Sequence, residues 1–332
     1  PEILRQFVGR RGRHESSTHR LRSSLRLPTI SPSAAPPVEM SIATRTLLRV
    51  RIVAPASTAN IGSGYYCLGL ALDLSFELTF SGSSSGATDA TVGAEPHELI
   101  RADIIGDRHP AMVAFRKSGG VGPLQASTKI PPGKGMGFSG AAHVAGAAAA
   151  FVQRFGQIDR NSVLASAAEL EGHADNAAPS VYGGFTIAAG GRVISLEVPT
   201  DLLLVAWIPA TETSTASSRA RLPEVVSHAD ASFNVGRAAL LVAAMSTGDL
   251  GALRIATEDR LHQAIRLVDS PTSSAALNVA LESNAIAAWL SGSGPTVVAL
   301  ATRETAESIA STLATNGHCK ILEVDRQGVR LL

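Results

Sequence analysis

A glycine-dense turn followed by an alanine-rich stretch lies near the middle of the chain. Residues 131–142 have the sequence PPGKGMGFSGAA, and residues 143–151 continue as HVAGAAAAF, a segment typical of a helix. Because glycine adopts backbone angles that other residues avoid, such a turn can wrap around a ligand with its N–H groups pointing inward. The first turn of a helix adds unpaired N–H groups and the positive end of a dipole. The pattern therefore predicts an anion site, most often one for phosphate.

Two other interpretations of this turn stay open. One is a flexible connector before a buried helix. The other is a dinucleotide site, because residues 135–140 match G-x-G-x-x-G. Against it, two prolines stand where a strand should enter, and Asp159, the acid at about the required spacing, is typical of the cap of a following helix. The Walker form is absent, since Lys134 precedes a glycine and not a hydroxyl residue.

A second polar cluster follows about thirty residues later. Residues 171–176 contain four potential ligands, namely Glu171, His173, Asp175 and Asn176. One interpretation is a capped helix end, with Pro179 ending any helix before it. Another is a zinc site through the histidine and an aspartate, although zinc needs three or four ligands. A further glycine-rich turn at residues 291–295 is either a tight turn between strands or a support for the phosphate turn.

The composition limits the kind of protein. The chain has 332 residues, 45% of them hydrophobic, so it can form two domains or one large one. A formal net charge of +1 argues against a nucleic-acid surface over the whole chain. Cys67 and Cys319 are too few for a disulfide framework, which fits a reducing cytoplasm. No apolar run approaches the roughly 20 residues that span a bilayer, so we expect no membrane partner.

The first 39 residues differ from the rest of the chain. They contain seven arginines, no lysine and frequent Ser and Pro. This composition resembles an organelle transit peptide, and it also fits a translated upstream region ahead of Met40, the interpretation that we favour. A nucleic-acid-binding arm is a third interpretation, given the basic run. In each case we expect residues 1–45 to form a disordered extension outside the fold.

Apolar periodicity predicts the elements that must position these segments. Strands are expected at 48–54, 70–80, 124–130, 185–188, 193–198, 202–208, 286–290, 296–301 and 320–324, and helices at 109–118, 140–155, 162–171, 233–245, 259–268 and 304–314. The stretch 55–69 is small, polar and glycine-bearing, and we expect it to be a functional loop between the first two strands. We place a domain boundary near residues 199–200.

Five stretches in one order resemble the GHMP family of small-molecule kinases. The first is PASTANIG at 55–62 with CLGLAL at 67–72, and the second is PGKGMGFS at 132–139. The third, EGHADNAAP at 171–179 with glycines at 183 and 184, is most similar to the homoserine kinases of that family. The set is completed by DRLHQ at 259–263, ending at Arg266, and by LSGSGPT at 290–296. Each motif alone is weak to moderate, but five in order make a strong resemblance from about residue 48 to the end.

The resemblance implies an α/β (α+β) fold of two domains. A ribosomal-protein-like α/β domain would span residues 46–200, and a ferredoxin-like α/β domain would span residues 201–332. ATP and the acceptor would lie in the cleft between them. Kinases of this type transfer the γ-phosphoryl group of MgATP to the hydroxyl of L-homoserine in threonine biosynthesis, so ATP and Mg²⁺ are the expected cofactors. A cytoplasmic enzyme with a small-molecule substrate is expected, and dimers are usual in the family.

The resemblance also implies roles for individual residues, carried over by position. The ATP site would consist of Pro132, Gly133, Lys134, Gly135, Met136, Gly137, Phe138, Ser139, Gly140, Ala141 and Ala142. Ser139 and Glu171 would hold Mg²⁺, which prefers oxygen ligands. The acceptor would be bound by Asn60, Tyr66, Asn176, Arg219 and Arg266. The arginines suit its carboxylate because they can bind it bidentately. Thr215, Arg219 and Glu171 would act in catalysis, with Thr215 near the reacting hydroxyl.

The chain departs from the family pattern at two positions. Tyr66 stands where the family usually has an aspartate that contacts the substrate, so a negative charge is missing from the acceptor pocket. Phe138 stands where the ATP loop usually has a serine. These changes motivate a second hypothesis, a non-catalytic or substrate-shifted protein of the same fold that binds nucleotide or an amino acid. A third hypothesis, a nicotinamide oxidoreductase, rests on the G-x-G-x-x-G match.

Overall fold

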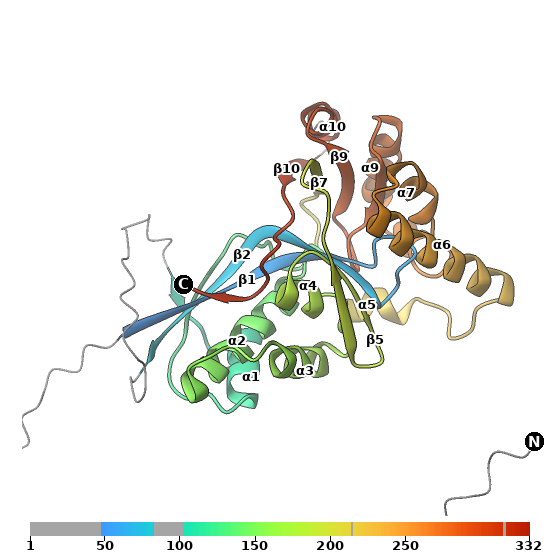
Figure 1. Cartoon of the computed structure of the whole chain (residues 1–332). Coiled ribbons are helices and arrows are strands. Elements are labelled where there is room, and N and C mark those ends of the chain that lie inside the picture. Colours follow the sequence, from blue (N-terminus) through green and yellow to red (C-terminus); the bar gives the residue numbers. More distant parts are fainter. Residues whose placement is uncertain (1–47, 83–101, 214, 315–316) are drawn as a thin grey trace, which may run out of the picture. The chain divides into compact units, whose positions relative to one another are not determined.

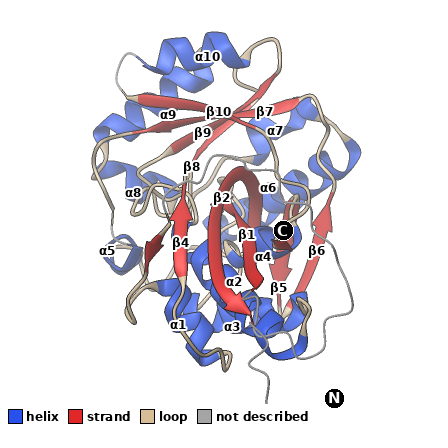
Figure 2. Cartoon of the chain, turned by 90° about the vertical axis from the view of Figure 1, so that its left-hand side faces the viewer, coloured by secondary structure: helices blue, strands red, loops and turns tan. Residues whose placement is uncertain are grey.

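Two β-sheets with flanking helices form the framework of the protein. The computed structural model describes residues 48–82, 102–213, 215–314 and 317–332, and Figures 1 and 2 show their arrangement. The extension expected over residues 1–45 lies outside these ranges. Within the described ranges, none of the helices has both the length and the apolar character needed to cross a membrane.

The first sheet is built on a long antiparallel pair, β1 (Leu48–Ala59) and β2 (Leu68–Gly82). The strand order is β11-β1-β2-β4-β3, and β2 also pairs with β5, which pairs with β6. The other strands are β3 (Asp103–Ile104), β4 (Gln125–Thr128), β5 (Phe185–Ala189), β6 (Arg192–Leu196) and β11 (Arg330–Leu331). From Leu74 to Phe80 buried apolar residues alternate with more exposed polar ones, so β2 buries one face there.

Helices cover one face of this sheet and lie below β1 and β2 in Figure 1. They are α1 (Pro110–Lys117), α2 (Phe138–Phe155), α3 (Arg160–Glu171) and α4 (Ala177–Tyr182). The central one is α2, which is buried without interruption from Gly140 to Ala150. Its small side chains let α1 approach closely, because a Cβ at Gly146 would stand 2.0 Å from the carbonyl oxygen of Ala111.

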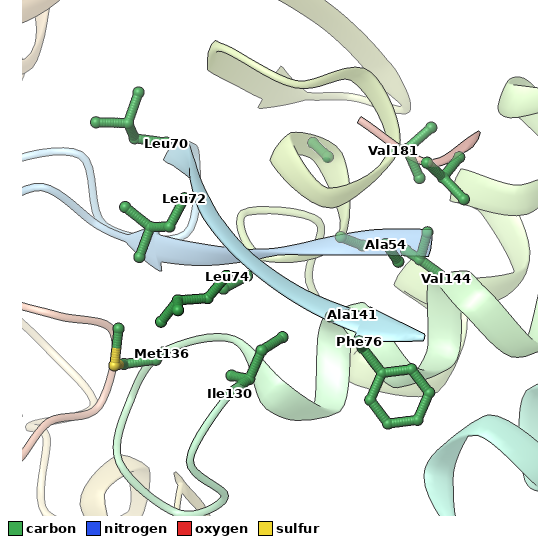
Figure 3. Close-up of a cluster of buried hydrophobic side chains, with 14 of the residues drawn as sticks. Ala54, Leu70, Leu72, Leu74, Phe76, Ile130, Met136, Ala141, Val144 and Val181 are labelled. Carbon is green, nitrogen blue, oxygen red and sulfur yellow. The ribbon is translucent and has the colours of Figure 1, made fainter. Parts of the chain in front are cut away.

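The core beneath the first sheet also anchors the glycine turn. Figure 3 shows Met136, from the middle of that turn, and Ile130, from the segment before it, among the leucines of β2. Both side chains are 1% exposed. Burial of such a side chain is worth about 1.5–3 kcal/mol relative to leaving it in water. The turn is therefore held in place by the core at its centre, although its glycines alone would be flexible.

The second sheet is antiparallel, in the order β10-β7-β9-β8. Its strands are β7 (Leu202–Ile208), β8 (Ala287–Leu290), β9 (Val297–Thr302) and β10 (His318–Leu322). All of β7 is buried because successive residues pack into two different cores. Leu203 and Val205 contact the cluster under α9 and α10, whereas Leu202 and Leu204 join the core of the first sheet.

The remaining helices belong to the second half of the chain. They are α5 (Thr215–Ala220), α6 (His228–Thr247), α7 (Leu250–Ala256), α8 (Gln263–Val268), α9 (Pro271–Glu282) and α10 (Ala306–Leu313). The change from one sheet to the other falls between β6 and β7, next to the predicted boundary at 199–200. The last strand, β11, returns to pair with β1. The division into residues 46–200 and 201–332 stays a prediction.

Three predicted details of these elements are wrong for local reasons. Residues 55–59 continue β1 instead of starting a loop, because β1 keeps pairing with β2 after a register shift at Pro55. The helix expected from 259 begins at Gln263, because the Asp259 carboxylate accepts hydrogen bonds from the N–H groups of the intervening residues. Pro179 ends no helix but lies in the first turn of α4, where a missing N–H breaks no intrahelical bond.

Replacing Gly146 with Ala should destabilise the protein by about 1–3 kcal/mol, because the new methyl group would overlap the backbone of Ala111. The matched control is Gly236→Ala in α6, where a Cβ would meet nothing within 4 Å. There the higher helix propensity of alanine should preserve or raise stability, by up to about 1 kcal/mol. Urea unfolding followed by circular dichroism measures both variants, and equal stabilities would contradict the close packing of α1 on α2.

Candidate active site

A cleft of about 710 Å³, open to solvent, brings most of the predicted site residues together. Six segments line it: the loop after β1, the glycine turn with the start of α2, the segment from α3 to α4, the segment after β7, α8, and the turn between β8 and β9. The predicted residues in its lining are Asn60, Tyr66, Gly133, Lys134, Gly135, Met136, Gly137, Phe138, Ser139, Gly140, Glu171, Asn176 and Arg266.

The other predicted residues lie around this lining. Ala141 and Ala142 are fully buried behind the first turn of α2, and Pro132 precedes the lining glycines. Arg219 is exposed on α5, with its guanidinium carbon 5.2 Å from the ring centroid of Tyr66. Thr215 is the first residue of α5, and its side chain lies outside the described part of the chain.

Glycine is required in the turn by both backbone angle and space. The φ values of Gly133, Gly135 and Gly137 are +69°, +75° and +70°, in the region that side chains disfavour. A Cβ at Gly135 would stand 2.3 Å from the carbonyl oxygen of Ser291, and one at Gly137 would stand 2.1 Å from Ser57 Oγ. The turn therefore passes so close to its neighbours that another residue would displace it.

The carbonyl groups of the turn are bonded to the surrounding protein. The carbonyl oxygen of Met136 accepts from the Ser57 N–H at 3.2 Å, and that of Gly135 accepts from Ser291 Oγ at 2.7 Å. Directly after it, α2 begins at Phe138, where the first N–H groups of a helix have no partner within the helix. The arrangement suits an anion at the start of α2.

The ammonium of Lys134 has a structural contact. Its Nζ donates to the carbonyl oxygens of Ala210 and Thr211 at 2.6 and 2.7 Å, and it lies 4.0 Å from Glu212. These residues follow β7, so the lysine ties the segment after the second sheet to the glycine turn. Because its ammonium is engaged in these contacts, we expect Lys134 to contact a ligand through its backbone.

Ser139 and Glu171 meet where the start of α2 lines the cleft. Ser139 Oγ donates to Glu171 Oε1 at 2.5 Å, and His143 Nδ1 lies 2.6 Å from the same oxygen. Burial raises the pKa of Glu171, but the hydrogen bonds from His143 and Ser139 outweigh it and leave the pKa below its usual range. The carboxylate is therefore ionised at neutral pH, and its second oxygen can face a cation in the cleft.

The oxygen donors at this point fit a hard divalent cation. A hydroxyl and a carboxylate are the ligands that Mg²⁺ prefers, and Mg²⁺ usually takes its remaining ligands from phosphates and water. Within the ranges that the structure describes, no group of three His, Cys, Asp or Glu side chains is placed to hold a metal. His173 and Asp175 hydrogen-bond to each other, so these two members of the polar cluster form a pair.

Tyr66 and Asn60 shape the other end of the cleft. Both have left-handed backbones, with φ of +62° and +69°. Asn60 Oδ1 accepts from the Tyr66 N–H at 3.0 Å, and Asn60 Nδ2 donates to the Gly292 carbonyl at 3.1 Å. The Tyr66 ring stacks on Tyr65 and on His173, with centroid distances of 4.0 and 5.0 Å. Asn60 thus holds the loop that presents Tyr66.

Arg266 is fixed by a buried network that starts at Asp259. The guanidinium donates from Nη1 to the Gly292 carbonyl at 2.9 Å and lies 3.2 Å from His262 Nδ1. His262 Nε2 contacts the Gly62 carbonyl at 2.8 Å. Burial lowers the pKa of His262, so the neutral ring donates from Nε2 and accepts from the arginine at Nδ1. Among the described residues, Arg266 Nε is buried without a hydrogen-bond partner.

The side chain of Asp259 supports this network. It accepts from the N–H groups of Leu261, His262 and Gln263 and from Asn234 Nδ2. Burial raises the pKa of Asp259, but the nearby His262 and these hydrogen bonds outweigh it and lower the pKa below its usual value.

Several residues of the site were missed by the sequence analysis. His143 lies four positions after Ser139, on the same side of α2, and this spacing could have indicated it. Tyr65, in the stretch 55–69, and His262, in the motif DRLHQ, were given no role, since a stack between distant segments leaves no local signal.

Comparisons with known proteins identify the family of the chain. Residues 108–184 match the family model of the GHMP kinases N-terminal domain, and residues 241–319 match that of the GHMP kinases C-terminal domain. A homoserine kinase of Streptomyces coelicolor is 35% identical over 303 residues, covering 85% of this chain and 94% of the relative. A homoserine kinase of Thermus thermophilus is 40% identical over 258 residues, covering 76% and 86%.

Solved structures show the same fold. A homoserine kinase of Cytophaga hutchinsonii superposes with a TM-score of 0.72 at 25% identity, covering 89% of this chain and all of that one. A mevalonate kinase superposes with a TM-score of 0.60 at 11% identity, covering 83% and 99%. The mixed α/β, two-domain architecture expected from the sequence is thereby confirmed.

Asp259→Asn should lower stability by about 1–3 kcal/mol at pH 7, because a buried ionised acceptor of several hydrogen bonds is lost. Since the native pKa of Asp259 is below its ordinary value of 3.8, its contribution is present above that value and is lost as pH falls through the native pKa. The gap to the parent should therefore narrow between pH 5 and about pH 3 in urea unfolding. Asp249→Asn, at the exposed start of α7, is the control and should show no such gap. A gap that stays constant over this range would contradict the assignment.

Proposed function

The chain belongs to the GHMP kinase family, and from this we propose that it transfers the γ-phosphoryl group of ATP to the hydroxyl of L-homoserine. One observation carries the proposal. The Ser139–Glu171 pair at the start of α2 lies in the same cleft as Arg266 and Asn176, so groups suited to a metal-bound phosphate face groups suited to an amino acid. The curated relatives, which are homoserine kinases over most of this chain, favour the enzyme over a non-catalytic protein of the same fold.

ATP is the phosphoryl donor of the family, and we place its phosphates at residues 132–142. The backbone N–H groups of the glycine turn and the start of α2 supply donors for them. The side chains of Ala141 and Ala142 contribute by being small, since they are buried in the core. Phe138 packs edge-on against Phe76, with ring centroids 5.9 Å apart, so its ring belongs to the core side of the turn.

Mg²⁺ is proposed to bind at Ser139 and Glu171. A cation held by these two side chains would supply positive charge against the charge that develops on the phosphates during transfer. His143 keeps the Glu171 carboxylate ionised and oriented by its hydrogen bond to Oε1. The protein thus provides a preformed oxygen pair next to the helix start.

The acceptor is proposed to lie between Asn60, Tyr66, Asn176, Arg219 and Arg266. Arg266 lines the cleft, and the exposed Arg219 of α5 reaches the ring of Tyr66 in that lining, so we expect both guanidinium groups to bind the acceptor carboxylate. Asn176 Nδ2 makes a contact of 3.4 Å with Asp175, and its Oδ1 accepts from Ser57 at 3.0 Å. Asn176 therefore lies between the phosphate end and the acceptor end.

Phosphoryl transfer of this kind depends on position and charge. The bond between the acceptor oxygen and Pγ forms while the bond from Pγ to the ADP oxygen breaks, and the acceptor proton leaves to solvent. The transition state is loose, so a strong base is not required. We propose that Arg219 neutralises charge near the transferring group and that Thr215 lies near the reacting hydroxyl. A dimer and a cytoplasmic location remain predictions.

Glu171→Gln should reduce kcat/KM for L-homoserine about 10²–10³-fold and raise the Mg²⁺ concentration needed for half-maximal rate, because a charged group at the reacting phosphates is removed. Coupled ADP release measures both quantities. The matched control is Glu169→Gln, two residues earlier on α3, whose side chain is 67% exposed and pairs with Lys117. It should keep parental kinetics.

Thermal unfolding separates a metal role from a folding role. Glutamine keeps an acceptor for Ser139, so the melting temperature of Glu171→Gln should change little. A parent enzyme that releases no homoserine-dependent ADP would contradict the proposed function. Loss of activity in proportion to loss of folded protein would contradict the metal role.

A further inference from the structure

The carboxylates in the cleft are already engaged by neighbouring side chains. Among the described residues that line it, the carboxylates are Glu171 and Asp175. Glu171 is bonded to Ser139 and His143 at the phosphate end. Asp175 is 2% exposed, and its Oδ1 is bonded to His173 and lies 3.4 Å from Asn176 Nδ2. An acceptor ammonium would therefore meet, among these residues, only carboxylates that already hydrogen-bond to a histidine.

The charged groups that remain at the acceptor end are cations. Arg266 lines the cleft and has an unpaired Nε, and the Arg219 guanidinium lies over the ring of Tyr66. Guanidinium groups bind carboxylates bidentately. The electrostatics therefore favour an acceptor that carries a carboxylate and disfavour one whose cationic group must come close to these arginines.

Tyr66 lies at the acceptor end with an unusual backbone conformation. Its backbone φ of +62° is in the left-handed region, which a bulky residue rarely adopts and where Asp and Asn are far more common. Its ring contacts Tyr65, His173 and Arg219, so little of its faces is left for a ligand cation. Its hydroxyl is buried without a hydrogen-bond partner among the described residues. A phenol can donate to a hydroxyl or carboxylate oxygen but cannot pair with an ammonium at neutral pH.

We propose that Tyr66 makes the acceptor site select a hydroxyl and a carboxylate but not an ammonium, so that the chain also phosphorylates four-carbon ω-hydroxy acids that lack the amine. The inference rests on the proposed function and widens its acceptor class. The chemistry is unchanged: the acceptor oxygen bonds to Pγ, the bond from Pγ to ADP breaks, and the hydroxyl proton leaves to solvent.

The expected discrimination follows from what the site leaves unpaired. A site that holds a group for each polar atom of its substrate rejects an analogue lacking one of them by about 10⁴–10⁵, because its own polar group is left without a partner. Here a substrate without the amine leaves each described carboxylate of the cleft with its histidine partner. An ammonium that is buried without a partner, in contrast, costs desolvation free energy. The parent protein should therefore show values of kcat/KM for L-homoserine and 4-hydroxybutanoate within about tenfold of each other.

The test measures acceptor-dependent ADP release with both compounds for the full chain and for Tyr66→Asp. Aspartate suits the left-handed backbone, and its carboxylate can bind the ammonium, so the variant should fold and should raise the ratio of homoserine to 4-hydroxybutanoate kcat/KM at least about tenfold. Circular dichroism checks folding. Tyr182→Phe removes a phenol hydroxyl that bonds to Asn161 outside the cleft lining, and it should leave this ratio as in the parent.

The outcomes separate the inference from the proposed function. Comparable turnover of both acceptors, with a raised ratio in Tyr66→Asp, supports the inference. Turnover of homoserine alone, or a ratio that Tyr66→Asp does not change, overturns it and leaves the proposed function standing. Turnover of neither acceptor by the parent overturns both.

Discussion

The site depends on one backbone constraint: three segments that are far apart in the sequence must meet within hydrogen-bond distance at the glycine turn. Met136 bonds to Ser57 of β1, Gly135 bonds to Ser291 after β8, and the Gly292 N–H donates to the Ala59 carbonyl at 3.1 Å. These contacts join the two sheets. Because Gly135 and Gly137 leave no room for a Cβ, the phosphate end and the acceptor end have a fixed relation before a ligand enters.

Different elements carry the negative and the positive charges of the cleft. At the phosphate end, α2 and α3 bring together Ser139, His143 and Glu171, and their hydrogen bonds keep the carboxylate ionised. At the acceptor end, Asp259 and His262 hold Arg266 through a buried chain of contacts. The negative charge at one end is suited to a metal and the positive charge at the other to a carboxylate, so the proposed acceptor would bind in one orientation.

Much of this was predictable from sequence because it depends on local patterns. The alternation in β2, the continuous apolar run of β7 and the glycine turn before α2 each reflect a local requirement of burial or backbone angle. Glu171 was assigned its role from its place in the motif EGHADNAAP, as the resemblance implied. The contacts of Lys134 with the segment after β7 and the stack of Tyr66 on His173 depend on where distant segments meet, so sequence spacing could not indicate them. Asn60 was predicted as a substrate ligand, and the structure shows it holding its own loop; its contact with substrate stays a prediction.

The most direct test of this account is a crystal structure with a non-hydrolysable ATP analogue and Mg²⁺. The account predicts that the β- and γ-phosphates lie against the N–H groups of residues 133–140 and that the metal lies within direct or water-bridged reach of Ser139 Oγ and Glu171. A polyphosphate bound elsewhere, or a metal whose ligands include neither side chain, would contradict it.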